Sequence, residues 1–151
     1  MTSLVVVISI HHDNTVKLGN AIAKVLDANV KKPQSVKIEE INDYDVIGFG
    51  SGIYDETVHN SLFSLVEKIP KVENKKAFIF STAWFSSSKK ATNDHKKLRE
   101  KLESKGFQIL DEFQCKGFNT NSFLKFFGGM NKGRPNAEDI KNAEEFARNL
   151  I

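Results

Sequence analysis

The sequence has one cysteine, three arginines and no long apolar run among its 151 residues, and each scarcity excludes a class of protein. The single thiol, Cys115, excludes an internal disulfide and a Cys-x-x-Cys redox pair. Any redox chemistry must therefore come from a bound cofactor. Few arginines argue against nucleic-acid binding, because base reading and phosphate clamping favour the planar guanidinium. The lysines are scattered, so the net charge of +3 fits solvated helix faces.

Apolar runs are equally limited. The longest one near the N-terminus, residues 4–8, is followed by Ser9 and then by two histidines, so it is too short for a secretory signal. No stretch approaches the ~20 apolar residues of a membrane span. We therefore expect a cytoplasmic protein with no membrane span. The length fits one domain covering residues 1–151.

Apolar runs alternate with amphipathic segments along the whole chain. Strands are predicted at five short runs, residues 4–8, 35–38, 45–50, 77–80 and 107–115, of which the first is unbroken by charge. Helices are predicted where apolar residues recur at helical spacing, in residues 15–26, 58–69, 93–105 and 137–150. Such alternation predicts an α/β fold in three layers, with a five-stranded parallel sheet between helices.

Three of the predicted loops are rich in serine, threonine, glycine and aromatic residues. They follow the first, third and fourth strands. In a sheet of order 2-1-3-4-5 these loops lie side by side where the strand order reverses, and open α/β sheets bind ligands at that point. We therefore predict this strand order, with one ligand site formed by the three loops.

The first loop leads from a buried strand directly into a helix. Free backbone N–H groups and the helix dipole make such a junction suitable for a phosphate. The hydroxyls of Ser9 and Thr15 and the amide of Asn14 are further donors. The alternative is that Asn14 or Thr15 only caps the helix. His11 and His12 are expected to hydrogen-bond near the phosphate rather than bind a metal, because adjacent residues rarely point at one ion.

The other two loops offer surfaces for a flat ring. Gly50 and Gly52 permit positive φ and a close approach of the backbone, and Tyr54 adds an aromatic face. The third loop places Trp84 among small polar residues, which suits a ligand better than the core and predicts a ring held between Tyr54 and Trp84. The residues expected to hold the ring are Ser51, Gly52, Ile53, Tyr54, Ser81, Thr82, Ala83 and Trp84.

The first loop reads Ser9-Ile10-His11-His12-Asp13-Asn14-Thr15-Val16-Lys17. It resembles the pattern Ser-x-His-His-Gly-Asn-Thr-x-Lys of the short-chain flavodoxin family. The likeness extends to residues 44–54, 76–82, 113–120 and 132–140, and so covers essentially the whole chain. The resemblance implies a flavodoxin-like 2-1-3-4-5 sheet and non-covalent FMN. It also implies transfer of one or two electrons to a redox partner protein or a small electron acceptor. The phosphate loop implied by the resemblance contains Ser9, His11, His12, Asp13, Asn14 and Thr15.

Two features depart from the family pattern. Asp13 replaces a glycine, and its carboxylate would repel a phosphate unless it points to solvent, although aspartate tolerates a left-handed backbone. The chain is mildly basic, whereas flavodoxin carriers are typically acidic, so an acidic docking surface is not evident. Two alternatives stay open: a flavodoxin-like FMN oxidoreductase of the quinone or protoporphyrinogen class, and a binding module of this fold without flavin.

The remaining chemically active side chains are expected to be structural. Cys115 is predicted to be a core residue at the end of a strand, and His59 and His95 to lie at the surface of helices. The aromatic segment of residues 118–130 is expected to fold over the last strand, or to form a hydrophobic lid or a contact with a second subunit. We expect a monomer or a weak dimer.

Overall fold

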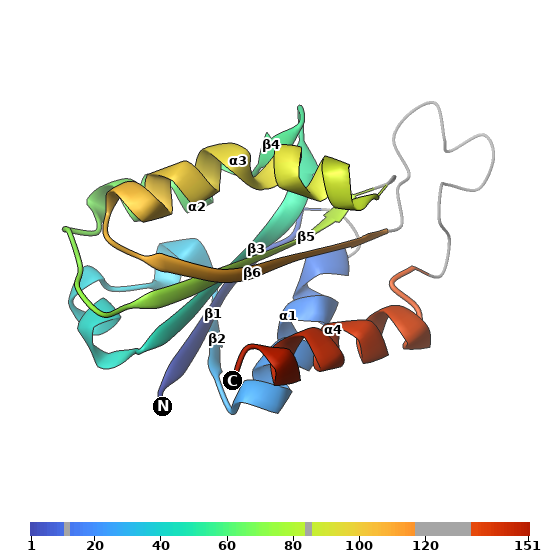
Figure 1. Ribbon diagram of the computed structural model, residues 1–151, viewed down its shortest axis with the longest axis horizontal. Coiled ribbons are helices and arrows are strands. Elements are labelled where there is room, and N and C mark those ends of the chain that lie inside the picture. Colours follow the sequence, from blue (N-terminus) through green and yellow to red (C-terminus); the bar gives the residue numbers. More distant parts are fainter. Residues whose placement is uncertain (11–12, 84–85, 117–133) are drawn as a thin grey trace.

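A computed structural model describes residues 1–10, 13–83, 86–116 and 134–151 (Figure 1). A sheet lies between two pairs of helices, as the sequence predicts. Helices α2 (Asn60–Lys68) and α3 (Ser88–Ser104) cover one face, and α1 (Asn14–Leu26) and α4 (Ala137–Asn149) cover the other. No helix of the described residues is both long enough and apolar enough to cross a membrane.

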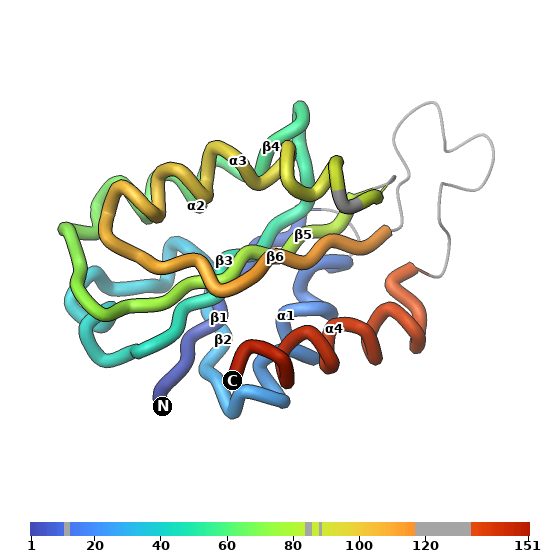
Figure 2. Tube along the Cα trace, viewed as in Figure 1, coloured from blue at the N-terminus to red at the C-terminus, as the bar shows by residue number. Residues whose placement is uncertain are grey.

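The strand order reverses beside the first strand. Five strands pair in parallel in the order β2 (Asn29–Lys31), β1 (Ser3–Ile8), β3 (Val46–Tyr54), β5 (Lys76–Ala83) and β6 (Gln108–Lys116), and Figure 2 traces their connections. A sixth strand, β4 (Thr57–Val58), pairs antiparallel with the end of β3. Because β4 is a two-residue addition beside this path, the predicted order 2-1-3-4-5 and the flavodoxin-like α/β fold are confirmed.

The apolar strands are buried on both faces because successive side chains point to opposite sides of the sheet. In β1, Leu4 and Val6 join the core beneath α2 and α3, while Val5 and Val7 join the core against α1 and α4. Phe78 and Phe80 of β5 lie in the second core. The two cores leave the carboxyl ends of β1, β3 and β5 at one edge of the molecule.

The prediction of a second strand at residues 35–38 is wrong. The strand is Asn29–Lys31, and the chain then forms two short 3-10 helices, Pro33–Ser35 and Ile38–Asp43. The true strand lies at the sheet edge and its side chains are mostly exposed, so it carries no apolar signal. Val36, between the two 3-10 helices, and Ile38, the first residue of the second one, pack against the core instead.

The second predicted loop is mostly strand. The β3 strand continues to Tyr54 and turns into β4 through Asp55 and Glu56, whose φ angles of 51° and 64° are typical of a two-residue hairpin turn. Gly50 and Gly52 do not use the positive φ that glycine permits; among the described glycines only Gly106 has a positive φ. Gly50 is needed for packing instead, because an added Cβ would lie 2.2 Å from ring atoms of Phe80.

The α3 helix begins earlier than predicted, at residue 88 instead of residue 93. Its N-cap is Ser87, whose hydroxyl accepts the backbone N–H of Lys90 at 3.1 Å. The earlier start places the first turns of α3 next to the ends of β5 and β6. The prediction missed these turns because they carry two lysines and no apolar stripe.

Candidate functional site

Buried polar side chains gather at the carboxyl ends of the central strands. Asn14 and Thr15 follow β1, Ser51 lies in β3, and Ser81 and Thr82 lie in β5, each with no more than 7% of its surface exposed. Ser51 and Ser81 are register partners on neighbouring strands. The predicted convergence of the three segments is therefore found, since parallel strands end at a common edge.

Ser9 organises the junction between β1 and α1. Its hydroxyl oxygen accepts the backbone N–H groups of Thr15 at 3.0 Å and Val16 at 3.2 Å. The sequence predicts Ser9 as a donor to a phosphate, with Asn14 or Thr15 as a helix cap in the alternative. In the structure Ser9 is instead an acceptor, and its oxygen gathers two N–H groups of the first helical turn.

Asp13 occupies the N-cap position of α1 in the left-handed conformation that the sequence suggested, with φ 51° and ψ 30°. Its side chain makes no capping hydrogen bond and is exposed. The carboxylate therefore points into solvent, as it must if a phosphate is to lie at this helix terminus. His11 and His12, also predicted for this loop, lie outside the described residues.

Tyr54 connects the hairpin with the first loop. Its half-buried hydroxyl accepts the backbone N–H of Ile10, and its ring packs edge-on against His59 with centroids 5.5 Å apart. Burial raises the pKa of Tyr54, although the hydrogen bond from Ile10 opposes the shift. The hydroxyl also lies over Gly52, where an added Cβ would come within 2.8 Å of it. His59 is the N-cap of α2, not the surface helix position predicted for it.

The last residues of β5 face opposite sides of the sheet. Thr82 makes a buried hydroxyl–hydroxyl hydrogen bond of 2.8 Å with Thr15 of α1. Ser81 bonds to α3 on the other side, through His95. Ala83 is 7% exposed at the strand end, while Trp84, the predicted stacking partner of the ring, lies outside the described residues.

A cavity of about 780 Å³ opens between the β3–β4 hairpin and the first half of α3. Ile53 and Ala83, two of the residues predicted to hold a ring, line it. Charged side chains form much of the rest of its lining: Asp55, Glu56, Lys89, Lys90, Asp94 and Lys97. Its volume is in the range of pockets that bind drug-sized ligands, roughly 300–1,000 Å³.

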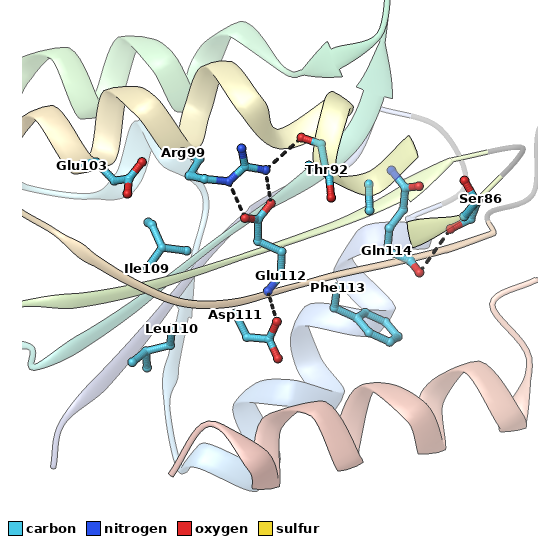
Figure 3. Close-up of a pocket in the computed structure, with 12 residues that line it drawn as sticks. Ser86, Thr92, Arg99, Glu103, Ile109, Leu110, Asp111, Glu112, Phe113 and Gln114 are labelled. Atoms are coloured by element: carbon cyan, nitrogen blue, oxygen red, sulfur yellow. Dashed lines mark hydrogen bonds and ion pairs between the residues drawn. The ribbon is translucent and has the colours of Figure 1, made fainter. Parts of the chain in front are cut away.

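The prediction of a surface position for His95 is wrong. His95 is completely buried, with Nε2 2.7 Å from Ser81 Oγ and Nδ1 2.9 Å from Glu112 Oε1. Arg99 donates to both carboxylate oxygens of Glu112 and also to the carbonyl oxygen of Thr92 (Figure 3). We call the hydrogen-bonded series Glu112–His95–Ser81 the buried polar chain.

Burial alone would raise the pKa of the Glu112 carboxyl, but hydrogen bonds from His95 and Arg99 outweigh it and hold that pKa at about 2. Glu112 is therefore ionised at neutral pH. Gln114 adds a branch, since its side-chain nitrogen donates to Ser81 Oγ at 3.1 Å and to Asp94 Oδ2 at 2.9 Å. Asp94 in turn pairs with Lys90.

Of the residues in the buried polar chain, His95 has a position that the sequence could have indicated. His95 stands three residues before Leu98 and seven before Leu102, so it lies on the apolar stripe of its helix. Glu112 was not recognisable, because an irregularity in the pairing of β5 and β6 shifts the alternation of side chains between Ile109 and Glu112. Without that irregularity Glu112 would point to the opposite face.

Cys115 is the core residue that the sequence predicts. It is 7% exposed, and burial raises the pKa of its thiol to about 12, with a smaller contribution from Asp139. A thiol in this state is not a nucleophile at neutral pH. The aromatic segment of residues 118–130 lies outside the described residues, so the predictions for it stay predictions.

Comparison with known proteins agrees with this architecture. A family model described as a flavodoxin domain matches residues 5–126. An uncharacterised protein of Methanocaldococcus jannaschii is 50% identical over 151 residues, which cover 100% of this chain and 99% of the relative.

Solved flavodoxin structures share the fold at low sequence identity. An archaeal flavodoxin superposes with a TM-score of 0.74 at 17% identity, covering 99% of this chain and 96% of that one. Oxidised flavodoxin 2 from Bacillus cereus gives 0.73 at 16%, covering 99% and 97%. A Fusobacterium nucleatum flavodoxin bound to flavin mononucleotide gives 0.66 at 12%, again covering 99% and 97%. With the family model matching most of its length, this chain belongs to the flavodoxin domain family.

Proposed function

We propose that this chain is an FMN-binding electron-transfer protein of the flavodoxin type, formed by one domain over residues 1–151. The observation that carries the proposal is the gathering of buried hydroxyl and amide side chains at the edge where β1, β3 and β5 end. Open α/β sheets bind ligands at the switch point of strand order, so polar side chains gathered there favour a polar ligand.

The phosphate end of the proposed site is the N-terminus of α1. The N–H groups of Thr15 and Val16 already converge on one oxygen, that of Ser9. A phosphate oxygen suits the same donors and the positive end of the helix dipole. The exposed carboxylate of Asp13 leaves room for this anion. We include His11, His12 and Asn14 in this loop as the sequence predicts.

The ring end of the proposed site is the cavity between the hairpin and α3. Ile53 and Ala83 give it apolar walls. We assign the neighbouring strand-end residues and Trp84 to the same site from the sequence; the strand-end residues are Ser51, Gly52, Tyr54, Ser81 and Thr82. FMN supplies the redox chemistry when bound, because the flavin accepts one or two electrons.

This chain's own residues would orient the flavin and limit its contact with water. We propose a carrier rather than a substrate-converting oxidoreductase, and a cytoplasmic one, which exchanges electrons with a redox partner protein or a small electron acceptor. The fold and the site are common to carriers and oxidoreductases, so turnover of a quinone with NAD(P)H is the assay that separates them.

The test is an equilibrium titration of the unloaded protein with FMN and, separately, with riboflavin, which lacks the phosphate. We expect saturable binding of FMN and about 100-fold weaker binding of riboflavin, because charge-assisted hydrogen bonds to the phosphate are lost. Failure to bind either flavin would overturn the proposal and leave a flavodoxin-fold module of another function.

A charge variant locates the phosphate. Asp13→Asn keeps a residue that tolerates the left-handed backbone and removes the negative charge at the start of α1. We expect it to bind FMN about threefold to tenfold more tightly and riboflavin unchanged. Asp27→Asn is the matched control, because Asp27 has the same left-handed conformation at the other end of α1. Equal effects of both variants would contradict this placement.

A further inference from the structure

The first half of α3 carries positive charge that its own surroundings do not balance. Residues 88–97 contain four lysines and one carboxylate, Asp94, which is 3% exposed and pairs with Lys90. The other three lysines are exposed, and we call them the lysine face: Lys89, Lys96 and Lys97. In the part of the chain that the structure describes, no carboxylate forms an ion pair with any of these three.

The second half of the same helix is electrically balanced. Arg99 pairs with Glu112 of β6. Lys101 pairs with Glu67 of α2. Two glutamates on the helix make residues 98–104 neutral overall. The unpaired positive charge of α3 is therefore confined to the half that begins at the carboxyl ends of the strands.

The lysine face does not stabilise its own helix. The positive end of a helix dipole lies at the N-terminus, so carboxylates stabilise a first turn and lysines destabilise it. The first turn of α3 has no acidic residue and contains Lys89. Lys97 stands four residues before Lys101, a spacing at which like charges also destabilise a helix. Residues that work against local stability are often functional, which favours a binding role over the solvated helix face expected from the sequence.

The lysine face borders the proposed ring end of the flavin site. Lys89 and Lys97 line the same cavity as Ile53 and Ala83. The first turns of α3 lie beside the β3–β4 hairpin and the end of β5 (Figure 1). A protein that contacts these lysines would therefore lie next to the ring, which is the part of FMN that exchanges electrons.

The hairpin on the other side of this cavity is acidic. Asp55 and Glu56 are exposed at its turn and also line the cavity. Among the described residues, no ion pair joins them to the lysine face. An acidic surface would be attracted to α3 and repelled by the hairpin, so the two sides of the cavity together determine how such a surface is oriented.

We propose that the lysine face is the docking surface for an acidic redox partner protein. This inference rests on the proposed function. Carboxylates of the partner pair with the exposed ammonium groups, and one electron passes between the partner's redox centre and the flavin ring. One of the two is oxidised and the other reduced, and no covalent bond forms or breaks. A nucleic acid fits this surface less well, because phosphate clamping favours arginine and the lysine face contains none.

The experiment measures how fast a reduced acidic protein passes one electron to the FMN-saturated protein. The probe is a plant-type two-iron ferredoxin with an acidic surface, which is a low-potential donor. Stopped-flow absorbance gives the second-order rate constant from about 0.01 M to about 0.15 M salt, over which the Debye length falls from about 30 Å to about 8 Å. We expect the rate constant to fall about tenfold over this range, because salt screens the attraction.

Removal of the lysine face should abolish most of this salt dependence. We expect the triple variant Lys89→Gln, Lys96→Gln and Lys97→Gln to react about tenfold more slowly than wild-type protein at low salt. The difference should shrink to less than about twofold near 1 M salt, where the Debye length is about 3 Å. The triple variant should be at least as stable in urea as wild-type protein, because it removes positive charge from the first turns of α3.

The matched control removes three lysines distant from the strand ends. Lys24 and Lys68 lie in the last turns of α1 and α2, and Lys71 lies between α2 and β5; all three are exposed. Replacing them with glutamine changes the net charge equally and should slow the reaction by less than about twofold.

A hairpin variant should have the opposite effect. Asp55→Asn combined with Glu56→Gln removes the two negative charges beside the lysine face. We expect it to react about threefold faster than wild-type protein at low salt, because the repulsion of the acidic partner is lost.

The outcomes separate the two proposals. If FMN binds and the reaction depends on salt equally in wild-type protein and in the lysine-face variant, the docking surface is overturned while the proposed function stands. A difference that persists in full near 1 M salt has the same meaning, since it would come from the flavin itself. Binding of a single-stranded oligonucleotide that the variant loses, without salt-dependent reduction by ferredoxin, would assign the face to nucleic acid instead. If FMN does not bind, the proposed function fails and the inference fails with it.

Discussion

Ser81 and Thr82 are adjacent in β5, yet they belong to two differently built sides of the same strand end. Thr82 faces α1 and makes a neutral hydroxyl pair with Thr15, above a core filled by Phe78 and Phe80. Ser81 faces α3 and continues into a series of ionisable groups that ends at Arg99. The packing of uncharged groups determines the arrangement on the Thr82 side, and interactions between charged groups determine it on the Ser81 side.

The difference shows that the two sides of one strand end can depend differently on pH. The Thr15–Thr82 contact on the α1 side joins two hydroxyl groups, which do not titrate near neutrality, so the geometry of this contact should not depend on pH there. The α3 side contains a fully buried imidazole between an ionised carboxylate and a hydroxyl. Substitutions on the two sides should therefore differ in size and, above all, in pH dependence.

The largest effect is expected from Glu112→Gln on the charged side. The change leaves Arg99 and His95 without their common anion, and breaking a buried ion pair costs about 3–5 kcal/mol of unfolding free energy. Because Glu112 is about one-fifth exposed, we expect the lower end of that range. Urea denaturation at pH 7 measures it. Glu67→Gln, in an exposed pair, should cost less than about 1 kcal/mol.

The same variant has a pH signature. The folded pKa of Glu112, about 2, lies below its ordinary value of 4.5, so its stabilisation is complete above pH 4.5 and is lost as the pH falls toward 2. Wild-type protein and Glu112→Gln should therefore converge in stability on acidification. A constant difference between them from pH 7 to pH 2.5 would show that the carboxylate charge is not the source of the effect.

An intermediate effect is expected from Gly50→Ala on the side determined by shape. The added Cβ would meet the ring of Phe80 at 2.2 Å, and overpacking of a core costs about 1–3 kcal/mol. Thermal unfolding measures the loss, which should not change with pH. Gly52→Ala in the same strand is the control, because its Cβ meets the far end of Tyr54, which can move. Equal losses would contradict the packing argument.

The smallest effect is expected from Thr82→Val. It leaves the buried hydroxyl of Thr15 without its partner, which costs about 1 kcal/mol. The double variant Thr15→Val with Thr82→Val removes both hydroxyls and should recover part of that loss. The coupling is read from a double-mutant cycle in urea at pH 5 and pH 8. A coupling that changed with pH would contradict the neutral character of this side.

The sequence predicted the shape-determined side well and the charged side poorly. Buried strands and amphipathic helices repeat locally, so β1, α1 and the strand order followed from periodicity, and the strand ends followed from topology. His95 is buried and not at the predicted surface position, since it stands on the same helix stripe as Leu98. Glu112 could not be placed from the sequence, since the irregular pairing of β6 depends on its neighbour strand. The edge strand β2 was missed because three exposed residues carry no pattern.

In the candidate site, too, some features were predictable from the sequence and others were not. The convergence of Ser9, Thr15 and Thr82 was predictable because each stands at a strand end or a helix start. Their hydrogen bonds were not predictable, because the Ser9 hydroxyl accepts N–H groups of the helix instead of donating to a ligand. The role of Gly50 was not predictable either, because it makes room for the ring of Phe80 instead of a ligand. Such choices depend on which atoms meet in three dimensions.

A crystal structure of the protein grown with FMN tests the central claim most directly. We expect the phosphate at the N–H groups of Thr15 and Val16, and the ring in the cavity between the β3–β4 hairpin and α3, next to Ile53 and Ala83. FMN bound elsewhere, for example in the cavity beside β6 that Arg99, Glu112 and Gln114 line, would contradict the account. A phosphate distant from α1 would contradict it as well.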